Sequence, residues 1–328
     1  MNDKRKILVL VPLLALTVLA GLYFGSTGLS LGDFFLALTG RGDSAYCLIL
    51  WQLRLPRVAA GILAGVGLST AGVLLQSVTA NELASPNIIG VNSGAGLAVI
   101  LMLTVAPAAG NILPFAAFAG AFGASLFILA AADRLSGSKS AILLIGIAIT
   151  TLLNAVISFL SLLDEGVLAQ YNHFTVGSLK AVRLEELAVP AVIIGLAFLT
   201  AMALSGQLSV LCLGDSAAAA LGVRVKRLRI LTLACAAAGA AAVVSFAGLL
   251  GFVGLVVPHI ARRLVGERPS RMLPCAALVG AVIVVLADLL GRTLFAPSEL
   301  PVGILMSMVG APYFLILLCR RRKYAGVS

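Results

Sequence analysis

Charged residues and the residue patterns of enzyme active sites are scarce in this sequence. Lys, Arg, Asp and Glu make up 11% of its 328 residues, whereas soluble globular domains have roughly 25%. The only histidines are His173 and His259, and this scarcity argues against a Ser/His/Asp hydrolase. No glycine is followed directly by lysine, so there is no Walker A loop for a nucleotide phosphate. We therefore predict no catalytic residue and expect any ATPase to be a separate chain.

Metal-binding patterns are missing as well. The cysteines are scattered singly, without a CxxC pair or a neighbouring histidine. They are Cys47, Cys212, Cys235, Cys275 and Cys319. We interpret them as packing residues, and we interpret His259 as structural because no second ligand lies near it. The sequence thus predicts neither a metal site nor a cofactor.

Apolar residues dominate the chain instead. They account for 61% of it, and the mean hydropathy is +1.12, so most of the chain must lie in lipid. At about 20 residues per span, the length allows on the order of ten transmembrane helices and leaves no room for a soluble catalytic domain. We predict an all-α integral membrane protein in which residues 1–328 form a single transmembrane domain. The apolar segments are 7–25, 56–78, 87–106, 112–132, 141–163, 187–205, 228–249, 250–265, 272–291 and 301–319.

Local patterns refine this assignment. The basic start Lys4–Lys6 and the apolar run after it resemble a signal peptide, but no convincing cleavage site follows, and we expect a first transmembrane helix. The stretch Leu231–Val265 is too long for one span, and we expect its glycines to divide it into two. Small residues recur at four-residue spacing, as in Gly61–Gly65, Gly90–Gly94 and Gly120–Ala124. This spacing lets helix backbones approach closely in lipid, although glycine and alanine are also simply common in such helices.

The basic residues predict the orientation, because short cytoplasmic loops retain positive charge. With both termini inside, the inner segments carry 17 of the 23 Lys and Arg residues and the outer segments carry 6. The outer residues are Arg41, Arg54, Arg57, Lys180, Arg183 and Arg292. Because the basic residues border spans and form no continuous patch, the net charge of +10 does not indicate nucleic-acid binding. We expect a multi-pass protein of the cytoplasmic (inner) membrane.

The inner segment of about residues 208–229 carries the signature of a short helix. Asp215 is a plausible N-cap, the alanines after it favour helix, and Gly222 is a reasonable C-terminal stop. Its residues alone leave open whether it is an interfacial loop element or a functional one.

Seven segments closely resemble the permease family of iron-siderophore, haem and cobalamin ABC importers, the FecCD type. They are Arg54-Leu55-Pro56-Arg57, AGVGLSTAGVLLQ (64–76), NELASPNIIGVNSGAG (81–96), LGDSAAAALGV (213–223), GFVGLVVPHIAR (251–262), ADLLGR (287–292) and ELPVGILMSMVGAPYF (299–314). The resemblance extends from about Arg54 to the carboxyl terminus. Chance similarity between apolar helices would not reproduce the polar residues within these segments.

The resemblance implies a ten-helix permease of a type II ABC importer. Its expected partners are a second permease copy or close paralogue, two ATP-binding cassette ATPase subunits inside and a substrate-binding protein outside. The cargo would be an iron chelate, with a ferric siderophore favoured over haem or cobalamin and an oxyanion such as molybdate less favoured still. Alternatives from other classes are an ion-coupled secondary transporter, which would work without ATP, and a noncatalytic scaffold or receptor.

The same resemblance assigns roles to particular residues. The short inner helix would dock on the ATPase as the coupling element. Its residues are Leu213, Gly214, Asp215, Ser216, Ala217, Leu221 and Gly222. At the outer face, Arg54, Arg57 and Arg292 would meet carboxylates of the binding protein. Alternatively, Arg57 only anchors a helix end, and Arg292 pairs with Asp288 four residues earlier.

Two inner loops would form the cytoplasmic gate by the same resemblance: Asn81-Glu82-Leu83 and Ser138-Lys139-Ser140. The family commonly has proline where this chain has Glu82. We hypothesise that Glu82 and Lys139 attract each other, within or across subunits, and hold the gate shut; alternatively, both are solvated loop charges.

Gln76, Asn154 and Asp288 are polar residues inside predicted spans, where lipid penalises them unless they face protein or water. We interpret Asp288 as a structural partner of Arg292 or of a backbone donor. A proton relay is not expected, because an ATP-driven permease needs no proton coupling.

Overall fold

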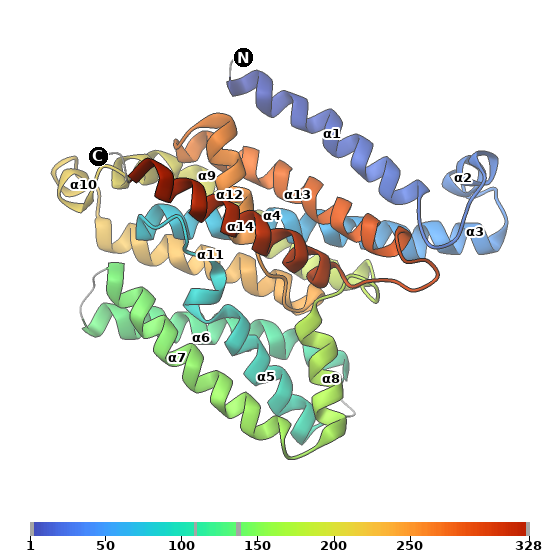
Figure 1. Cartoon of the computed structure of the whole chain (residues 1–328), viewed down its shortest axis with the longest axis horizontal. Coiled ribbons are helices and arrows are strands. Elements are labelled where there is room, and N and C mark those ends of the chain that lie inside the picture. The colour runs from blue at the N-terminus through green and yellow to red at the C-terminus, as the bar shows by residue number, and fades with distance from the viewer. Residues whose placement is uncertain (1–2, 108–109, 136–138, 326–328) are drawn as a thin grey trace.

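The computed structural model describes residues 3–107, 110–135 and 139–325, and this part of the chain contains helices and no strand. The α-helices are α1 (Asp3–Tyr23), α2 (Leu31–Leu38), α3 (Ser44–Leu48), α4 (Leu55–Thr79), α5 (Val91–Val105), α6 (Leu113–Leu135), α7 (Lys139–Ser161), α8 (Glu165–Val176), α9 (Ala188–Leu211), α10 (Asp215–Ala220), α11 (Val225–Ala247), α12 (Val253–Val265), α13 (Pro269–Thr293) and α14 (Val302–Ala325). A π-helical segment, η1 (Ile49–Arg54), joins α3 to α4, and three 3-10 turns are η2 (Pro86–Ile89), η3 (Gly110–Ile112) and η4 (Glu185–Leu187). α2 and α3 lie at one end of the molecule and α10 at the other (Figure 1).

Each of the ten apolar segments predicted from the sequence contains a helix. In the described part of the chain, seven helical stretches are long and apolar enough to cross a membrane. α5 and the apolar part of α14, Val302–Ile316, are shorter, and α12 has 13 residues. The all-α membrane class is therefore confirmed, whereas the number of about ten spans is not.

The long apolar stretch after α10 divides into α11 and α12, as predicted. α11 ends at Ala247, and Gly248 adopts a φ of +69°. The loop after α8 covers the break: Ser178 donates its N–H to the carbonyl of Ala247 at 2.9 Å, and Leu249 donates to that of Phe174 at 3.2 Å. Such a break is tolerated at membrane depth only where protein satisfies its backbone groups.

Glycine contacts set the spacing of the central helices. A Cβ added at Gly65 of α4 would collide with the backbone of Gly280 on α13. Gly94 of α5 and Gly120 of α6 meet backbone to backbone in the same way. The prediction that small residues allow close helix packing is confirmed at these positions.

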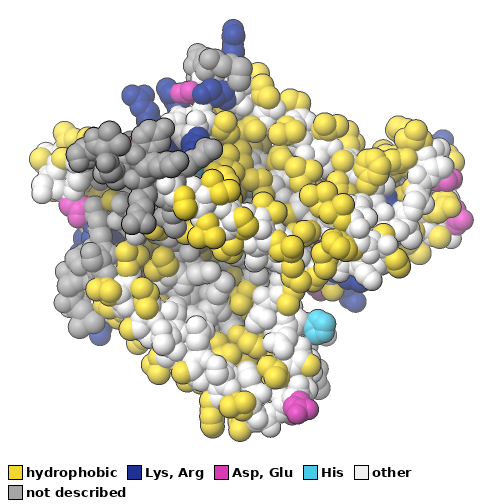
Figure 2. All heavy atoms as spheres, viewed as in Figure 1, with side chains coloured by type: hydrophobic (Ala, Val, Ile, Leu, Met, Phe, Trp, Pro, Cys, Tyr) yellow, Lys and Arg dark blue, Asp and Glu magenta, His cyan; other side chains and the backbone are white. Residues whose placement is uncertain are grey.

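The surface is apolar over much of its area. Large exposed apolar side chains occur on α1, α6, α7 and α9. Figure 2 shows apolar side chains across one face, with charged side chains gathered toward its edges. This distribution suits helices that present their outer faces to lipid.

Three short helices, α2, α3 and α8, were not predicted. Each begins at a residue whose side chain caps the helix: Ser30, Asp43 and Asp164. These capping residues are visible in the sequence, but a search for long apolar segments passes over helices of 5 to 12 residues.

The substitution Gly65→Ala tests the close contact between α4 and α13. We expect it to destabilise the purified protein by about 1–3 kcal/mol, because the added methyl group has no room, and thermal unfolding in detergent would measure this. Gly195→Ala is the matched control, since a Cβ on that α9 glycine meets nothing within 4 Å. Equal melting temperatures for the two variants would contradict the packing account.

Candidate docking, coupling and gate sites

A charge cluster lies at the end of the molecule that carries α2 and α3. Arg57 of α4 donates from Nε to Asp288 of α13 at 3.1 Å and from Nη1 to Glu299, before α14, at 3.0 Å. Arg292 approaches the same Asp288 with Nε at 3.6 Å. One carboxylate inside α13 therefore faces two guanidinium groups, and a second carboxylate shares one of them.

The other contacts of these arginines are to backbone carbonyls near the end of α1. Arg292 donates to the carbonyl of Gly21 at 2.5 Å. Arg54 donates to the carbonyls of Leu22, at 2.9 Å, Tyr23 and Thr27. All three arginines are buried within the single chain, with Arg292 only 2% exposed. The pair between Arg292 and Asp288, which the sequence offered as an alternative to docking, is present.

Glu299 and Lys180 complete this cluster, and the sequence analysis did not assign them to it. Lys180 Nζ lies 3.7 Å from Glu299, and its side chain is 69% exposed. Burial alone would raise the pKa of Glu299, but the charges of Arg57 and Lys180 outweigh it and hold that pKa below the usual value. The stabilisation from this carboxylate is therefore present above its unfolded pKa and is lost as the pH falls through the lower folded pKa.

At the opposite end, α10 forms the predicted short helix, with one correction at its start. Gly214, with a φ of +108°, is the N-cap, and Asp215 is the first helical residue. Asp215 instead accepts a hydrogen bond from Arg229 of α11 at 2.6 Å. A φ of +108° strains any residue that carries a Cβ, and glycine is therefore suited to this N-cap position.

The predicted stop at Gly222 is confirmed. Gly222 has a φ of +83° and donates to the carbonyl of Ala219, while Val223 donates to that of Ala218, which is a Schellman ending. Two leucines flank the helix on the surface: Leu213 is 70% exposed and Leu221 is 66% exposed. These leucines make α10 a small apolar projection beyond the helix bundle.

The structure describes all of the first predicted gate loop and only part of the second. In the first, Asn81 Oδ1 accepts from the N–H of Leu83 at 2.9 Å, and Glu82 lies 3.4 Å from Arg262 of α12. In the second, Ser138 lies outside the described residues, and Lys139 and Ser140 begin α7 with side chains that are not described. The pair between Glu82 and Lys139 therefore stays a prediction.

Two other polar residues of the sequence analysis have packing roles. Gln76, buried in α4, accepts from Arg262 at 3.2 Å and faces the carbonyl of Leu255 at 3.5 Å. The ring of His259 packs edge-on against Tyr313 at 6.4 Å between centroids. Among the described residues, no group of three or more His, Cys, Asp or Glu is placed to hold a metal ion.

The apolar helices and the apolar outer surface define a multi-pass membrane protein. The model of the FecCD transport family matches residues 13–320, and the chain belongs to that family. Its members are membrane permeases of the cytoplasmic membrane that work with ATPases on separate chains.

Three relatives illustrate the range of the family. The Fe(3+)-citrate import system permease protein YfmE of Bacillus subtilis is 37% identical over 316 residues, covering 94% of this chain and 95% of the relative. The hemin transport system permease protein HmuU of Yersinia pestis is 38% identical, with 96% of each chain covered. A solved metal-chelate-type ABC transporter, in an inward-facing conformation, superimposes with a TM-score of 0.86 at 30% identity, covering 97% of this chain and 99% of that one.

Removing a buried member of the charge cluster should lower the free energy of unfolding far more than removing its exposed member, Lys180. We expect Arg57→Leu to destabilise the protein by about 3–5 kcal/mol, since it leaves Asp288 and Glu299 with fewer compensating charges. Lys180→Leu, which removes an exposed ammonium from the same Glu299, should change stability by about 1 kcal/mol or less. Thermal unfolding of both variants would measure the difference, and similar melting temperatures would contradict a structural role for Arg57.

Proposed function

We propose that this chain is the permease subunit of an ATP-binding cassette importer that moves an iron chelate, a ferric siderophore, across the cytoplasmic membrane by alternating access. Haem and cobalamin are the alternative cargoes. Iron-citrate, hemin and cobalamin permeases have nearly equal identity to the chain, at 37%, 38% and 39%, so identity does not choose among these cargoes. The iron-citrate match covers more of this chain, 94% against 85% for the cobalamin match, which favours an iron chelate.

The observation that carries this proposal is a polar stripe on the exposed surface of α7. Thr151, Asn154 and Ser158 follow one another at helical spacing and are exposed in the single chain. The hydroxyls of Thr151 and Ser158 bond back to helix carbonyls, as expected for such side chains in an apolar setting. An exposed asparagine within a span favours a surface that faces water or protein rather than lipid.

Another face of α7 has the opposite character. Leu152 and Phe159 are 64% and 62% exposed, as suits lipid. The helix would thus stand at a boundary, with its apolar face toward lipid and its polar stripe toward a central pathway. The second wall of that pathway requires another permease copy or a close paralogue.

The ion pairs support the division of the segments between two sides of the membrane, which the proposal orients with both termini cytoplasmic. Among the described residues, every ion pair joins two segments assigned to the inner side or two groups at the outer side. α5, α12 and α14 would cross the membrane with the seven longer helices and make about ten spans. A helix shorter than the membrane is thick can still belong to a span where neighbouring helices bury the non-helical backbone at its ends.

ATP-binding subunits would engage the permease through α10. The exposed leucines at its two ends fit an apolar cleft, and the pair between Asp215 and Arg229 would transmit movement of α10 to α11. Closure of the two ATPase subunits would then shift the pathway helices. The permease itself contributes geometry and no chemistry.

The substrate-binding protein would dock on the outer face. Arg54, Arg57 and Arg292 are the arginines proposed for this contact, but each already has carboxylate or carbonyl acceptors. Direct pairing with the binding protein would require exchange of these acceptors, whereas Lys180 is accessible without any rearrangement. We therefore propose that Lys180 makes the first contact and that the arginines hold the outer helix ends in position.

ATP-driven uptake into proteoliposomes tests the proposed function. The chain is reconstituted with its ATPase and binding protein and offered a ferric siderophore, haem and cobalamin in turn. Uptake of the siderophore alone, lost without ATP, is the expected result. Uptake driven by an ion gradient without ATP would favour a secondary transporter and overturn the proposal.

Shortening both exposed leucines of the coupling element should weaken ATPase binding. For Leu213→Ala with Leu221→Ala we expect at least a tenfold loss of affinity for the ATPase subunit, since each buried leucine contributes about 1.5–3 kcal/mol. Leu184→Ala, at an exposed leucine of an outer loop, is the matched control and should bind normally. Unchanged binding by the double variant would contradict the role of α10.

Glu82→Ala tests the proposed inner gate. If this carboxylate helps to hold the gate shut, the variant should leak substrate from loaded proteoliposomes and hydrolyse ATP with less dependence on the binding protein. Glu267→Ala removes an exposed inner-loop carboxylate and serves as the control. A leak rate equal to that of the unaltered protein would remove Glu82 from the gate.

A further inference from the structure

A cavity of about 540 Å³ opens between α6, the first turn of α7 and the first turns of α11. It lies at the same end of the molecule as α10, which is the cytoplasmic end in the proposed orientation. Its apolar lining includes Leu129, Ile142, Ile230 and Leu233. Its charged lining is Asp133, Arg134, Lys226 and Arg229. None of these residues has a role in the coupling, docking or gate sites proposed from the sequence.

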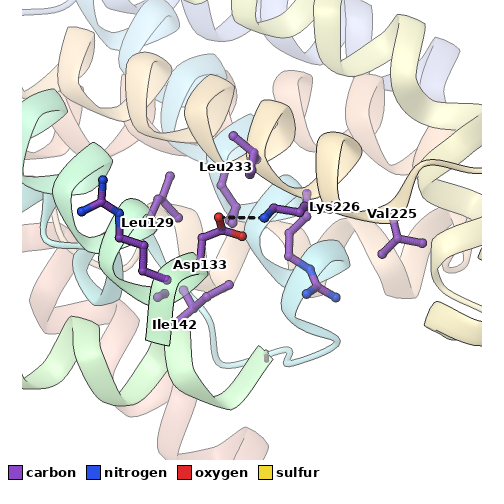
Figure 3. Close-up of a pocket in the computed structure, with 10 residues that line it drawn as sticks. Leu129, Asp133, Ile142, Val225, Lys226 and Leu233 are labelled. Atoms are coloured by element: carbon purple, nitrogen blue, oxygen red, sulfur yellow. Dashed lines mark ion pairs between the residues drawn. The ribbon is translucent and has the colours of Figure 1, made fainter. Parts of the chain in front are cut away.

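The charged lining is organised around one ion pair. Figure 3 shows Asp133 of α6 and Lys226 of α11 pointing toward each other, and their carboxylate and ammonium groups are 3.0 Å apart. Arg229 faces Asp215 of α10 at 2.6 Å. Arg134 is exposed and has no ion-pair partner among the described residues. The cavity therefore holds three cations against one lining carboxylate, and Asp215 balances only one more.

The start of α11 adds to this positive potential. No side-chain hydrogen bond caps its N-terminus in the described part of the chain, and its first two residues, Val225 and Lys226, line the cavity. The N-terminal end of a helix carries a partial positive charge that favours anions. Three cationic side chains and this helix end thus point to an anionic ligand.

The apolar lining and the location identify the source of that anion. Ile230 lines the cavity and is also exposed on the outer surface of the molecule. A ligand there would therefore meet both charged groups and hydrocarbon. A soluble anion would leave the apolar wall unused. Basic pockets between helices on the cytoplasmic side suit anionic lipid headgroups.

We propose that this cavity binds the phosphate headgroup of an anionic phospholipid, such as phosphatidylglycerol, from the inner leaflet. Arg134 and Lys226 contact the phosphate, while the upper acyl chains lie along Leu129, Ile142 and Ile230. Because Arg229 borders the cavity and also holds Asp215, the headgroup competes for the contact that fixes α10. That consequence, unlike the binding itself, rests on the proposed coupling role of α10.

Native mass spectrometry of the purified full-length chain tests the binding. The protein is titrated with phosphatidylglycerol or with phosphatidylcholine of the same acyl chains, and we expect selective retention of phosphatidylglycerol. Arg134→Gln with Lys226→Gln should weaken that binding by about tenfold or more, since each basic residue near an anionic surface contributes about a factor of five. Arg263→Gln with Arg268→Gln removes the same charge from exposed positions outside the cavity and should change binding less than twofold.

A variant with the opposite expected effect guards against misfolding as the explanation. Asp133→Asn removes the carboxylate that competes with the phosphate for Lys226, so phosphatidylglycerol should bind several-fold more tightly. Equal weakening by both double variants, equal binding of phosphatidylcholine, or displacement of the lipid by millimolar inorganic phosphate would overturn the proposal. ATPase and cargo are absent from this experiment, so failure of the proposed transport function would leave its result unchanged.

Discussion

Neutralisation of Asp288 within a membrane-spanning helix is the constraint on which the outer half of the structure depends. Asp288 lies near the end of α13, which runs from Pro269 to Thr293, and a carboxylate within a span is penalised unless it is paired or faces water. Here two guanidinium groups face it, from Arg57 and from Arg292 one turn along α13. Arg57 then reaches Glu299, and Arg292 reaches the end of α1. Charge compensation thereby joins α1, α4, α13 and the segment before α14, beside the apolar cluster that Leu22, Val58 and Val285 form between the same three helices.

The inner end uses charges differently. Its ion pairs are more exposed, with the side chains of Lys226 and Asp215 71% and 45% accessible, so each contributes little to stability and can exchange acceptors. The pair between Asp215 and Arg229 joins α10 to α11, and the pair between Lys226 and Asp133 joins α11 to α6. An outer end fixed by buried charges and an inner end held by exchangeable ones suits a permease that receives its driving force from inside.

The sequence predicted those features that depend on residues close together in the chain. Apolar runs located the ten segments that contain the main helices, the glycine after the alanines identified the end of α10 at Gly222, and four-residue spacing identified the close approach at Gly65. It missed α2, α3 and α8, whose helices are too short for an apolar search, and it placed the cap of α10 one residue late. Contacts between distant segments, such as Arg57 with Glu299 or Glu82 with Arg262, needed the fold, because no local pattern encodes which loops meet.

Water accessibility along α7 tests the central claim, a transport pathway lined by the polar stripe of this helix, most directly. Single cysteines at positions 151, 154 and 158, and at 152 as the lipid-facing control, would be placed in a variant lacking the five native cysteines and reconstituted with the partner subunits. The account predicts that a membrane-impermeant thiol reagent labels the stripe positions, at rates that change when ATP binds, and leaves position 152 unlabelled. Failure to label any stripe position in either nucleotide state, or equal labelling at 152, would contradict it.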